Sequence, residues 1–363
     1  MTAIASSTPL LDLGVIGPAD VAAAEARVTQ LLGTTSDVLL VQAEAIVALE
    51  ATAKGLARPG LRALNVVTGP YGALFGRWLA SSGAHVVTLE VPFDRAVSAS
   101  DVSSMLNAGR FDLVAVVHAE AATGSANPVE EIAPLVSAHG ALLVVDAVAS
   151  VGAHPVTPDP WGADVVVIGG QKALAGPAGV SALSISERAW AVMAQNPFAP
   201  RESILSLVDL RDGWLRSDRT GLLGTPSSLE TAALNQALAR VAEEGLESVI
   251  GRHRAAAAAS RTGLRALGLR PWIADDAAAA AVVTTFAIPG SVAELVSAAR
   301  AAGSRFVTAA PGSLATTTAR INHTGRAARL DLVRDDLRAL GAALGRPSES
   351  AADAAASAWE AVI

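Results

Sequence analysis

The sequence contains no cysteine among its 363 residues. It therefore cannot form a disulfide, hold a cysteine-ligated zinc ion or use a thiol as a nucleophile. Its six histidines are scattered, and none shows the HxxxH spacing of a helical metal site. From these absences we expect no metal ion.

Basic residues and long apolar runs are also scarce. The 27 Lys and Arg are outnumbered by 34 Asp and Glu, so we expect no binding to nucleic acid or to an anionic membrane. The longest apolar run, residues 277–288, contains two threonines, ends at Pro289 and is too short to span a bilayer. The first residues lack the basic and apolar regions of a targeting signal, so we expect a cytoplasmic protein.

Lysine and tyrosine are so rare that each one is interpreted separately. Only two of the basic residues are lysines, Lys54 and Lys172, and the single tyrosine is Tyr71. Lys54 comes just before Gly55 at the end of a predicted helix, where a solvated cation complements the helix carboxyl end. Lys172 instead follows an apolar run and two glycines.

Short apolar runs alternate with amphipathic stretches in the first three-fifths of the chain. Several of these runs are continuously apolar, as expected of strands that are covered on both faces. We expect strands at 38–41, 63–67, 85–89, 113–117, 141–145, 165–168 and 180–185. The pattern predicts an α/β fold with a doubly wound sheet and helices on both sides.

The pattern changes after Val180, which predicts a second, smaller α+β domain. We expect helices at 229–245, 246–267, 292–302 and 329–344, a strand at 281–287 and a weaker strand and loop over 306–322. The domains are then a large one over 1–250 and a small one over 251–345. We expect residues 1–36 to pack on the small domain, and residues 346–363 to form a tail that frays.

A carboxylate and a lysine follow two strands that are consecutive in the chain. One apolar strand ends in Asp146, and the next ends shortly before Lys172. Because ligands collect at the carboxyl ends of strands in such sheets, we expect the two side chains at one site. A pyridoxal enzyme needs this pair: the amine condenses with the aldehyde, and the carboxylate keeps the pyridine nitrogen protonated. The alternative is a surface ion pair.

Three motifs resemble those of the class V aminotransferases, a family of the fold-type I pyridoxal-phosphate superfamily. The motifs are HAEAATG (118–124), VVDAVASVG (144–152) and GGQKALAGPAGVS (169–181). The resemblance covers about residues 38–344 and lies in the branch of the alanine–glyoxylate, serine–pyruvate and pyridoxamine–pyruvate transaminases. It implies a large domain with a mixed, mostly parallel sheet, a smaller C-terminal α+β domain, and transaminase activity.

The resemblance also implies roles for individual residues. Lys172 would form the Schiff base, and Asp146 would pair with the pyridine nitrogen. Arg320 matches the position that grips the substrate carboxylate, for which a forked guanidinium is suited, and Tyr71 matches the aromatic residue that stacks on the ring. The remaining residues expected near the vitamin are Gln171, His118 and Thr123. The alternatives are a surface arginine, a core tyrosine at a helix start, and structural roles for His118 and Thr123.

The segment after the first strand departs from the family pattern. Relatives that bind the cofactor phosphate carry small residues there, whose amides cradle the dianion. Here the segment reads VQAEAIVALE and places Glu44 and Ala45 at that position. A carboxylate repels a phosphate but accepts a hydrogen bond from a neutral hydroxymethyl group. This pattern resembles pyridoxamine–pyruvate transaminase, for which pyridoxamine and pyridoxal are substrates. The alternative is that Glu44 only complements a helix N-terminus.

We therefore expect a transaminase that moves an amino group between pyridoxamine or pyridoxal and a small 2-keto acid such as pyruvate. One alternative is an enzyme that carries pyridoxal 5′-phosphate covalently on Lys172 and transaminates alanine or serine with glyoxylate or pyruvate. A second is a catalytically weak vitamin B6-binding protein. Thr225 in GTPSS matches a segment that reaches the neighbouring subunit's phosphate site, which implies a homodimer with shared active sites.

Overall fold

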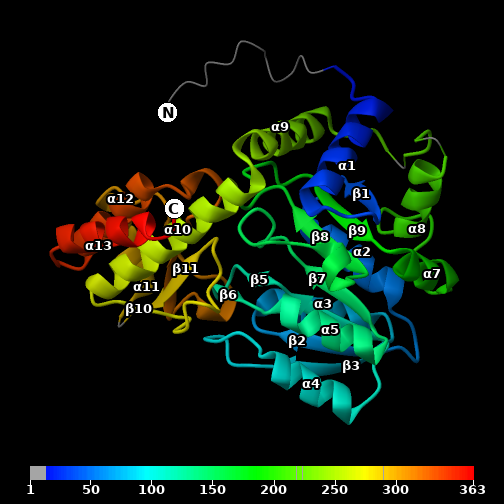
Figure 1. The fold of residues 1–363 in the computed structure, drawn as a ribbon, viewed down its shortest axis with the longest axis horizontal. Helices are drawn as coiled ribbons and strands as arrows, with labels where there is room; N and C mark the ends of the chain where they lie inside the picture. The colour runs from blue at the N-terminus through cyan, green and yellow to red at the C-terminus, as the bar shows by residue number, and fades with distance from the viewer. Residues whose placement is uncertain (1–13, 218, 223, 289) are drawn as a thin grey trace.

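The computed structural model describes residues 14–363 with the exception of 218, 223 and 289. In Figure 1 the chain forms two units that lie side by side, a large domain drawn mostly in blue to green and a small domain drawn in yellow to red. Within the described ranges, none of the helices is both long and apolar enough to cross a membrane.

A seven-stranded mixed sheet forms the centre of the large domain. Its strands are β1 (Asp37–Val41), β2 (Arg62–Val67), β3 (His85–Glu90), β4 (Leu113–Val117), β7 (Leu142–Asp146), β8 (Val165–Gly169) and β9 (Ser181–Ile185). They lie in the order β1-β9-β8-β7-β4-β2-β3, and only β9 runs antiparallel to its neighbours. Every residue of β4 and β8 is buried, which explains the absence of alternation in the sequence. The predicted strands and the α/β class are confirmed.

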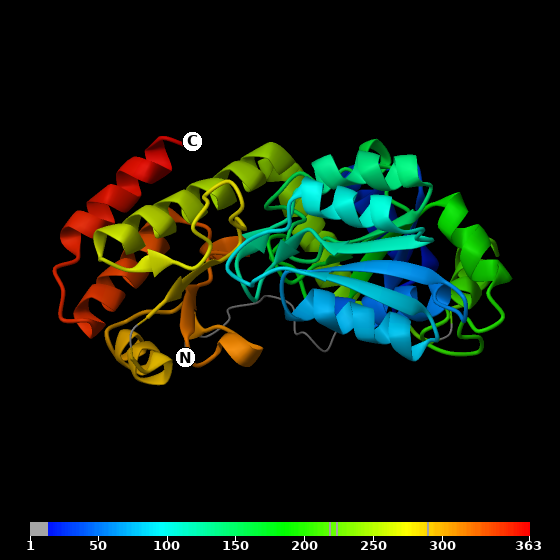
Figure 2. The same ribbon diagram turned by 90° about the horizontal axis from the view of Figure 1, so that it is seen from below.

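Helices cover both faces of this sheet, as Figure 2 shows. The helices of the large domain are α1 (Pro18–Leu32), α2 (Ala45–Leu56), α3 (Pro70–Ser81), α4 (Ala99–Ala108), α5 (Val129–His139), α6 (Pro158–Trp161), α7 (Glu187–Gln195), α8 (Leu207–Leu210) and α9 (Ser228–Glu244). A π-helical turn, η1 (Arg211–Leu215), continues α8, and a short hairpin of β5 (Ala119–Glu120) and β6 (Ser125–Ala126) follows β4. The hairpin lies at the carboxyl edge of the sheet, where β4 and β7 end.

The small domain has an antiparallel sheet in the order β10-β11-β13-β12. Its strands are β10 (Arg270–Pro271), β11 (Thr284–Ala287), β12 (Val307–Ala309) and β13 (Thr318–Ile321). Its helices are α10 (Leu246–Ala266), α11 (Val292–Ala301), α12 (Leu330–Ala343) and α13 (Glu349–Glu360), with short 3-10 turns at Gly312–Leu314 and Gly325–Ala327. Helix α10 joins the domains, since Val249 belongs to the core of the large domain and Ala256 to that of the small one. The division expected at residue 250 falls between these two residues.

Both ends of the chain differ from the expectation. Helix α1 packs on α9 and β1 of the large domain rather than on the small domain, because Val21, Ala24 and Val28 join the large core. Residues 1–13 lie outside the described part. The segment expected to be a fraying tail contains α13, which packs on α10 and α12. Its Ala351 and Ala355 are fully buried, because alanine lets two helices approach closely.

Two neutral histidines, the buried His253 and the half-buried His154, accept hydrogen bonds from backbone amides of the small domain. His253 donates from Nδ1 to the Val249 carbonyl oxygen at 2.7 Å, and its Nε2 accepts from the Gly325 amide at 2.9 Å. His154 Nε2 accepts from the Ala281 amide, also at 2.9 Å. Burial lowers the pKa of each of the two rings to about 4.

The protein should therefore lose stability as the pH falls below about 6.5, the ordinary pKa of histidine. Between this pH and about 4, the folded pKa of the two rings, the histidines are protonated in the unfolded chain but neutral in the folded protein. Protonation therefore favours the unfolded chain in this range. Each unit of pKa difference is worth about 1.4 kcal/mol per ring. Thermal unfolding followed by circular dichroism over this pH range measures the loss. His253→Gln should reduce the slope, whereas His85→Gln, at an exposed position, should keep it. Equal slopes in all three proteins would contradict the assignment.

Candidate active site

A cavity of about 170 Å³ opens at the carboxyl ends of β4, β7 and β8. Much of its wall is made of small apolar side chains, among them Ala119, Ala121 and Ala149. Five residues named from the sequence line it together: Glu44, Ala45, Tyr71, Asp146 and Lys172. The topology therefore brings together side chains that are far apart in the chain, as expected at the carboxyl edge of a parallel sheet.

Asp146 is the last residue of β7 and lies at the wall of the cavity. Its Oδ1 accepts a hydrogen bond from the Val148 amide at 3.0 Å. Burial raises the pKa of the carboxyl to about 6, and the nearby Glu44 adds to this, whereas the Val148 amide and Lys172 oppose it. Above that pH the carboxylate can pair with a cationic ring nitrogen in the cavity.

Lys172 follows β8 and lines the same cavity as Asp146. Burial lowers the pKa of its amine, and the positive charge of Arg320 lowers it further, although Glu44, Asp146 and Glu120 oppose the shift. More of the amine is therefore uncharged at neutral pH than in an exposed lysine. An uncharged amine is the form that attacks a carbonyl and accepts a proton.

The small domain contacts the backbone of the Lys172 turn. The turn closes through a hydrogen bond from the Ala175 amide to the Lys172 carbonyl oxygen, and Ala175 has φ 54°. Gly325 packs against that same oxygen, and a Cβ on it would lie 2.9 Å away. With φ 60°, Gly325 also has a conformation that favours glycine. Two neighbouring residues of α10 hold it: Arg252 donates to its carbonyl oxygen and His253 accepts from its amide.

Glu44 lies at the start of α2 and also faces the cavity. Its Oε2 accepts from the Ile46 amide at 2.9 Å, which makes it the N-cap of the helix. Its Oε1 accepts from Gln171 Nε2 at 2.6 Å. The two interpretations of Glu44 from the sequence are thus compatible, because one carboxylate caps the helix and lines the cavity. Gln171 is connected to the cavity by this hydrogen bond to Glu44. The Oε1 of Gln171 has no hydrogen-bond partner among the described residues.

Tyr71 of the large domain lines the cavity, and Arg320 of the small domain contacts its wall. Tyr71 follows Pro70 at the start of α3, and 39 % of its surface is exposed. Burial of the rest raises the pKa of its phenol, so the ring is neutral at physiological pH. Arg320 comes from β13, and its Nη1 donates to the carbonyl oxygen of Ala121, which is a residue of the cavity wall, at 2.9 Å.

His118, Thr123 and Thr225 lie away from this cavity, whereas Gln171 and Arg320 do not line it but are hydrogen-bonded to residues that do. His118 points to the opposite side from Val117 and Ala119, because side chains alternate along extended backbone, and its ring packs edge-on against Trp161. Thr123 is fully buried in the hairpin, where its Oγ1 lies 2.9 Å from Ser125 Oγ. His118 and Thr123 therefore lie where the alternative interpretation, a structural role, places them.

Thr225 lies in a different cavity, of about 200 Å³, on the other side of the start of α2. Gln42 and Ala43 line this second cavity, and Gln42 Oε1 accepts from the Ser227 amide at 3.0 Å. Thr225 itself is exposed. Within one chain, it is therefore separated from Lys172 by the segment that carries Glu44.

Glu120 is not among the site residues predicted from the sequence, although it lies within the HAEAATG motif. Its side chain is fully buried and packs against Gly69, where a Cβ would overlap the carboxyl group. Burial, and secondarily the charge of Asp146, raises the pKa of Glu120 to about 8. The carboxyl is therefore mostly neutral at pH 7 and adds little charge beneath Tyr71. Glu120 is the one carboxylate of the HAEAATG motif, and this was the available signal.

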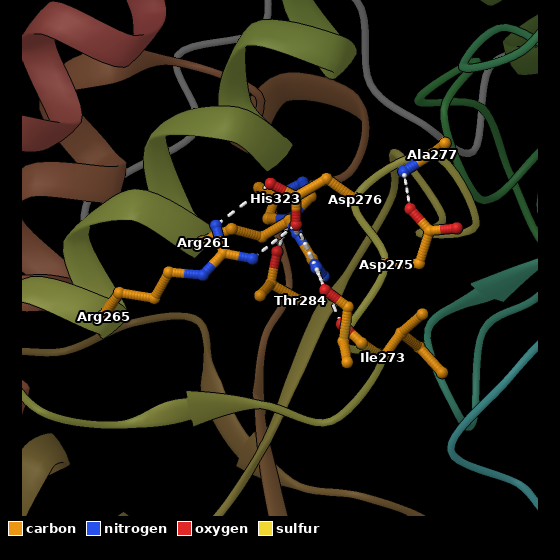
Figure 3. A network of polar contacts seen from close by, with 9 residues as sticks. Arg261, Arg265, Ile273, Asp275, Asp276, Ala277, Thr284 and His323 are labelled. Atoms are coloured by element: carbon orange, nitrogen blue, oxygen red, sulfur yellow. Dashed lines mark hydrogen bonds and ion pairs between the residues drawn. The ribbon is translucent and has the colours of Figure 1, made fainter.

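A polar network joins α10 of the small domain to the segment between β10 and β11 (Figure 3). Arg261 of α10 donates to Asp276 at 2.6 Å and to the carbonyl oxygen of Ile273 at 2.7 Å. His323 Nε2 lies 2.8 Å from the Thr284 hydroxyl, which ties the end of β13 to β11. In the part of the chain that the structure covers, no group of three or more His, Asp or Glu could hold a metal ion.

Comparisons with known proteins agree with this geometry. A family model described as Aminotransferase class-V matches residues 18–304. The pyridoxamine–pyruvate transaminase of Mesorhizobium japonicum is 38% identical over 309 residues, which is 84% of this chain and 78% of that protein.

Two solved structures are similar over nearly the whole chain. The crystal structure of pyridoxamine–pyruvate aminotransferase from Mesorhizobium loti has a TM-score of 0.91 and 34% identity, and the match covers 97% of this chain and 93% of that one. The alanine–glyoxylate aminotransferase from Nostoc sp. has a TM-score of 0.85 and 25% identity, with 92% and 90% covered.

The lowered pKa of Lys172 predicts that it reacts faster than Lys54 with a limiting amount of formaldehyde and a hydride reductant at neutral pH. Lys54 is the internal reference, since its amine lies 3.6 Å from Glu50 on the surface of α2. Peptide mass spectrometry separates the two products. In denaturant both lysines should react at similar rates. Preferential labelling of Lys54 in the native protein would contradict the assignment of Lys172 as the more nucleophilic amine.

Proposed function

The chain belongs to the class V aminotransferases, and we propose that it transfers an amino group between pyridoxamine and a small 2-keto acid such as pyruvate. Membership of the family confirms the resemblance seen in the sequence, the fold-type I architecture and the assignment as a transaminase. The identity of the two substrates is the part that we propose.

The position of Glu44 is the observation that carries the proposal. Its carboxylate lies at the N-terminus of α2, where it already occupies the place that a helix N-terminus offers to an anion. A phosphate brought next to it would meet like charge, at a cost of about 4 kcal/mol for two unit charges 4 Å apart near a protein surface. The hydroxymethyl group of pyridoxamine is neutral and can donate a hydrogen bond to Glu44. This favours the unphosphorylated vitamin.

The other residues of the cavity fit a pyridine ring. Its alanines leave room for a flat molecule, and Tyr71 lies at the wall where it can cover the ring face. Only Oδ1 of Asp146 is engaged by the Val148 amide, which leaves Oδ2 to pair with a ring nitrogen. A bound vitamin supplies the carbon that carries the amino group and a ring that accepts electrons.

Lys172 and Arg320 are the residues that act on the reacting partners. Lys172 lines the same cavity as Asp146, so its Nζ can take a proton from the carbon next to the ring of a bound vitamin and return it. Arg320 uses Nε and Nη1 in contacts with the protein, and its Nη2, which has no hydrogen-bond partner among the described residues, remains for the keto acid carboxylate. The small domain that carries Arg320 also supports the Lys172 turn through Gly325.

A second candidate function is transamination with a phosphate cofactor, as in alanine–glyoxylate exchange. The likeness to the aminotransferase from Nostoc sp. favours it at the level of the fold. In that case pyridoxal phosphate would be held covalently by Lys172, and Glu44 would have to tolerate the phosphate. A weak vitamin B6-binding protein without useful turnover is the third outcome that the assays below separate.

We also propose a homodimer in the cytoplasm. Ile204, with 82% of its surface exposed, lines the second cavity together with Thr225, and a second copy would cover this apolar region. The absence of cysteine is compatible with a reducing compartment. Sedimentation velocity tests the dimer, and a single species with the mass of one chain would contradict it.

The direct test is alanine formation from pyridoxamine and pyruvate. The wild type should form alanine, and Lys172→Ala should lower the rate at least about a hundredfold, because the residue that moves the proton is lost. Lys54→Ala, which removes the other lysine, should keep the wild-type rate. Failure of the wild type with pyridoxamine, together with activity that requires pyridoxal phosphate, would contradict the proposal in favour of the second candidate. Binding without turnover would favour the third.

Replacing Glu44 tests the choice of vitamin. Glu44→Ser should weaken pyridoxal binding about tenfold or more, because a hydrogen bond to a charged group is lost, and should improve binding of pyridoxal phosphate. Glu50→Gln is the matched control, since Glu50 lies on the same helix and pairs with Lys54 at the surface. Fluorescence titration with both vitamers measures the two affinities. An unchanged affinity ratio in Glu44→Ser would show that Glu44 does not discriminate.

A further inference from the structure

The guanidinium of Arg320 is held in a defined orientation by two acceptors. Its Nη1 donates to the Ala121 carbonyl oxygen at 2.9 Å, and its Nε donates to Thr308 Oγ1 at 3.2 Å. Thr308 lies on β12 directly opposite Arg320 on β13. The register of the small sheet therefore fixes the threonine hydroxyl beside the arginine.

Asn322 makes a second contact to the same hydroxyl. Its Nδ2 donates to Thr308 Oγ1 at 3.0 Å and to the carbonyl oxygen of Phe306 at 2.8 Å. The Phe306 carbonyl only accepts, so the Asn322 amide must point its NH2 group in this direction. Thr308 Oγ1 thus receives two hydrogen bonds, one from Asn322 and one from Arg320.

A hydroxyl oxygen has two lone pairs and one hydrogen. The Nε–H of Arg320 and the Nδ2–H of Asn322 occupy both lone pairs of Thr308 Oγ1. The hydroxyl hydrogen must therefore be donated, and neither Arg320 nor the NH2 group of Asn322 can accept it. Among the described residues, no acceptor for this hydrogen is present.

The guanidinium geometry of Arg320 indicates where an acceptor for the Thr308 hydroxyl hydrogen would lie. The Nε–H and one Nη2–H of an arginine are parallel, so two oxygens bound to them lie side by side. Arg338 shows this arrangement in the same chain: its Nε and Nη2 donate to the two oxygens of Glu349 at 2.9 and 3.1 Å. In Arg320 the Nε position is taken by the Thr308 hydroxyl. An oxygen bound to the free Nη2–H therefore lies next to that hydroxyl and can accept its hydrogen.

We propose that Thr308 is a specificity-determining residue that donates its hydroxyl hydrogen to the substrate carboxylate oxygen bound by Arg320 Nη2. Asn322 is a positioning residue, because its donation to Thr308 leaves the hydrogen free for the substrate. The inference rests on the proposed role of Arg320 and deepens it: the site selects a 2-keto acid through one arginine and one hydroxyl acting on the same carboxylate.

The test compares Thr308→Val with Thr308→Ser in the alanine-forming assay. Thr308→Val keeps the shape and loses the hydroxyl, so the KM for pyruvate should rise about tenfold or more. The KM for pyridoxamine should not change, and Thr308→Ser should restore the KM for pyruvate to near the wild-type value. Thr317→Val, at an exposed position at the edge of β13, is the control for a general effect of the exchange.

Acetaldehyde, an amino acceptor without a carboxylate, separates an effect on carboxylate binding from a general effect on the enzyme. Wild type and Thr308→Val should use it with equal kcat/KM. An equal loss with pyruvate and acetaldehyde, or an unchanged KM for pyruvate in Thr308→Val, would overturn the inference while leaving the proposed function intact. A wild-type protein that forms no alanine would overturn both.

Discussion

The function of this fold depends on two parallel strands, β7 and β8, that end at the same edge of one sheet. This places Asp146 and Lys172 on one cavity. Burial raises the pKa of the Asp146 carboxyl to about 6 and lowers the pKa of the Lys172 amine. Both groups can therefore bind or release a proton more readily near neutral pH than the same groups on the surface. Glu44 adds a carboxyl group to the same cavity, and our proposal of an unphosphorylated vitamin rests on its position.

The sheet, most helices and the central pair of residues could be predicted from the sequence. Strands such as β4 and β8 are buried on both faces, so their continuous apolar runs are visible without any structure. Asp146 and Lys172 could be placed together because the carboxyl ends of parallel strands share an edge. Glu44 could be singled out because a carboxylate repels a phosphate and is therefore unexpected in a segment that resembles a phosphate-binding one.

What could not be predicted depends on orientation and on long-range packing. The motif around His118 does not reveal that Val117 and Ala119 face the cavity while the histidine faces the other way. Helix α1 is rich in alanine, and its weak periodicity gave no indication that it packs on α9. The positions of Thr308 and Gly325 follow from the register of the small sheet and from contact between domains. Neither is encoded in local sequence.

The central claim is that Glu44 makes this a site for the unphosphorylated vitamin. The most direct measurement is the visible absorbance of the purified wild-type protein during parallel titrations with pyridoxal and pyridoxal phosphate. The account predicts a colourless protein that develops a band saturating at lower concentration with pyridoxal than with its phosphate. A protein that is purified with pyridoxal phosphate tightly bound, and that does not respond to pyridoxal, would contradict it.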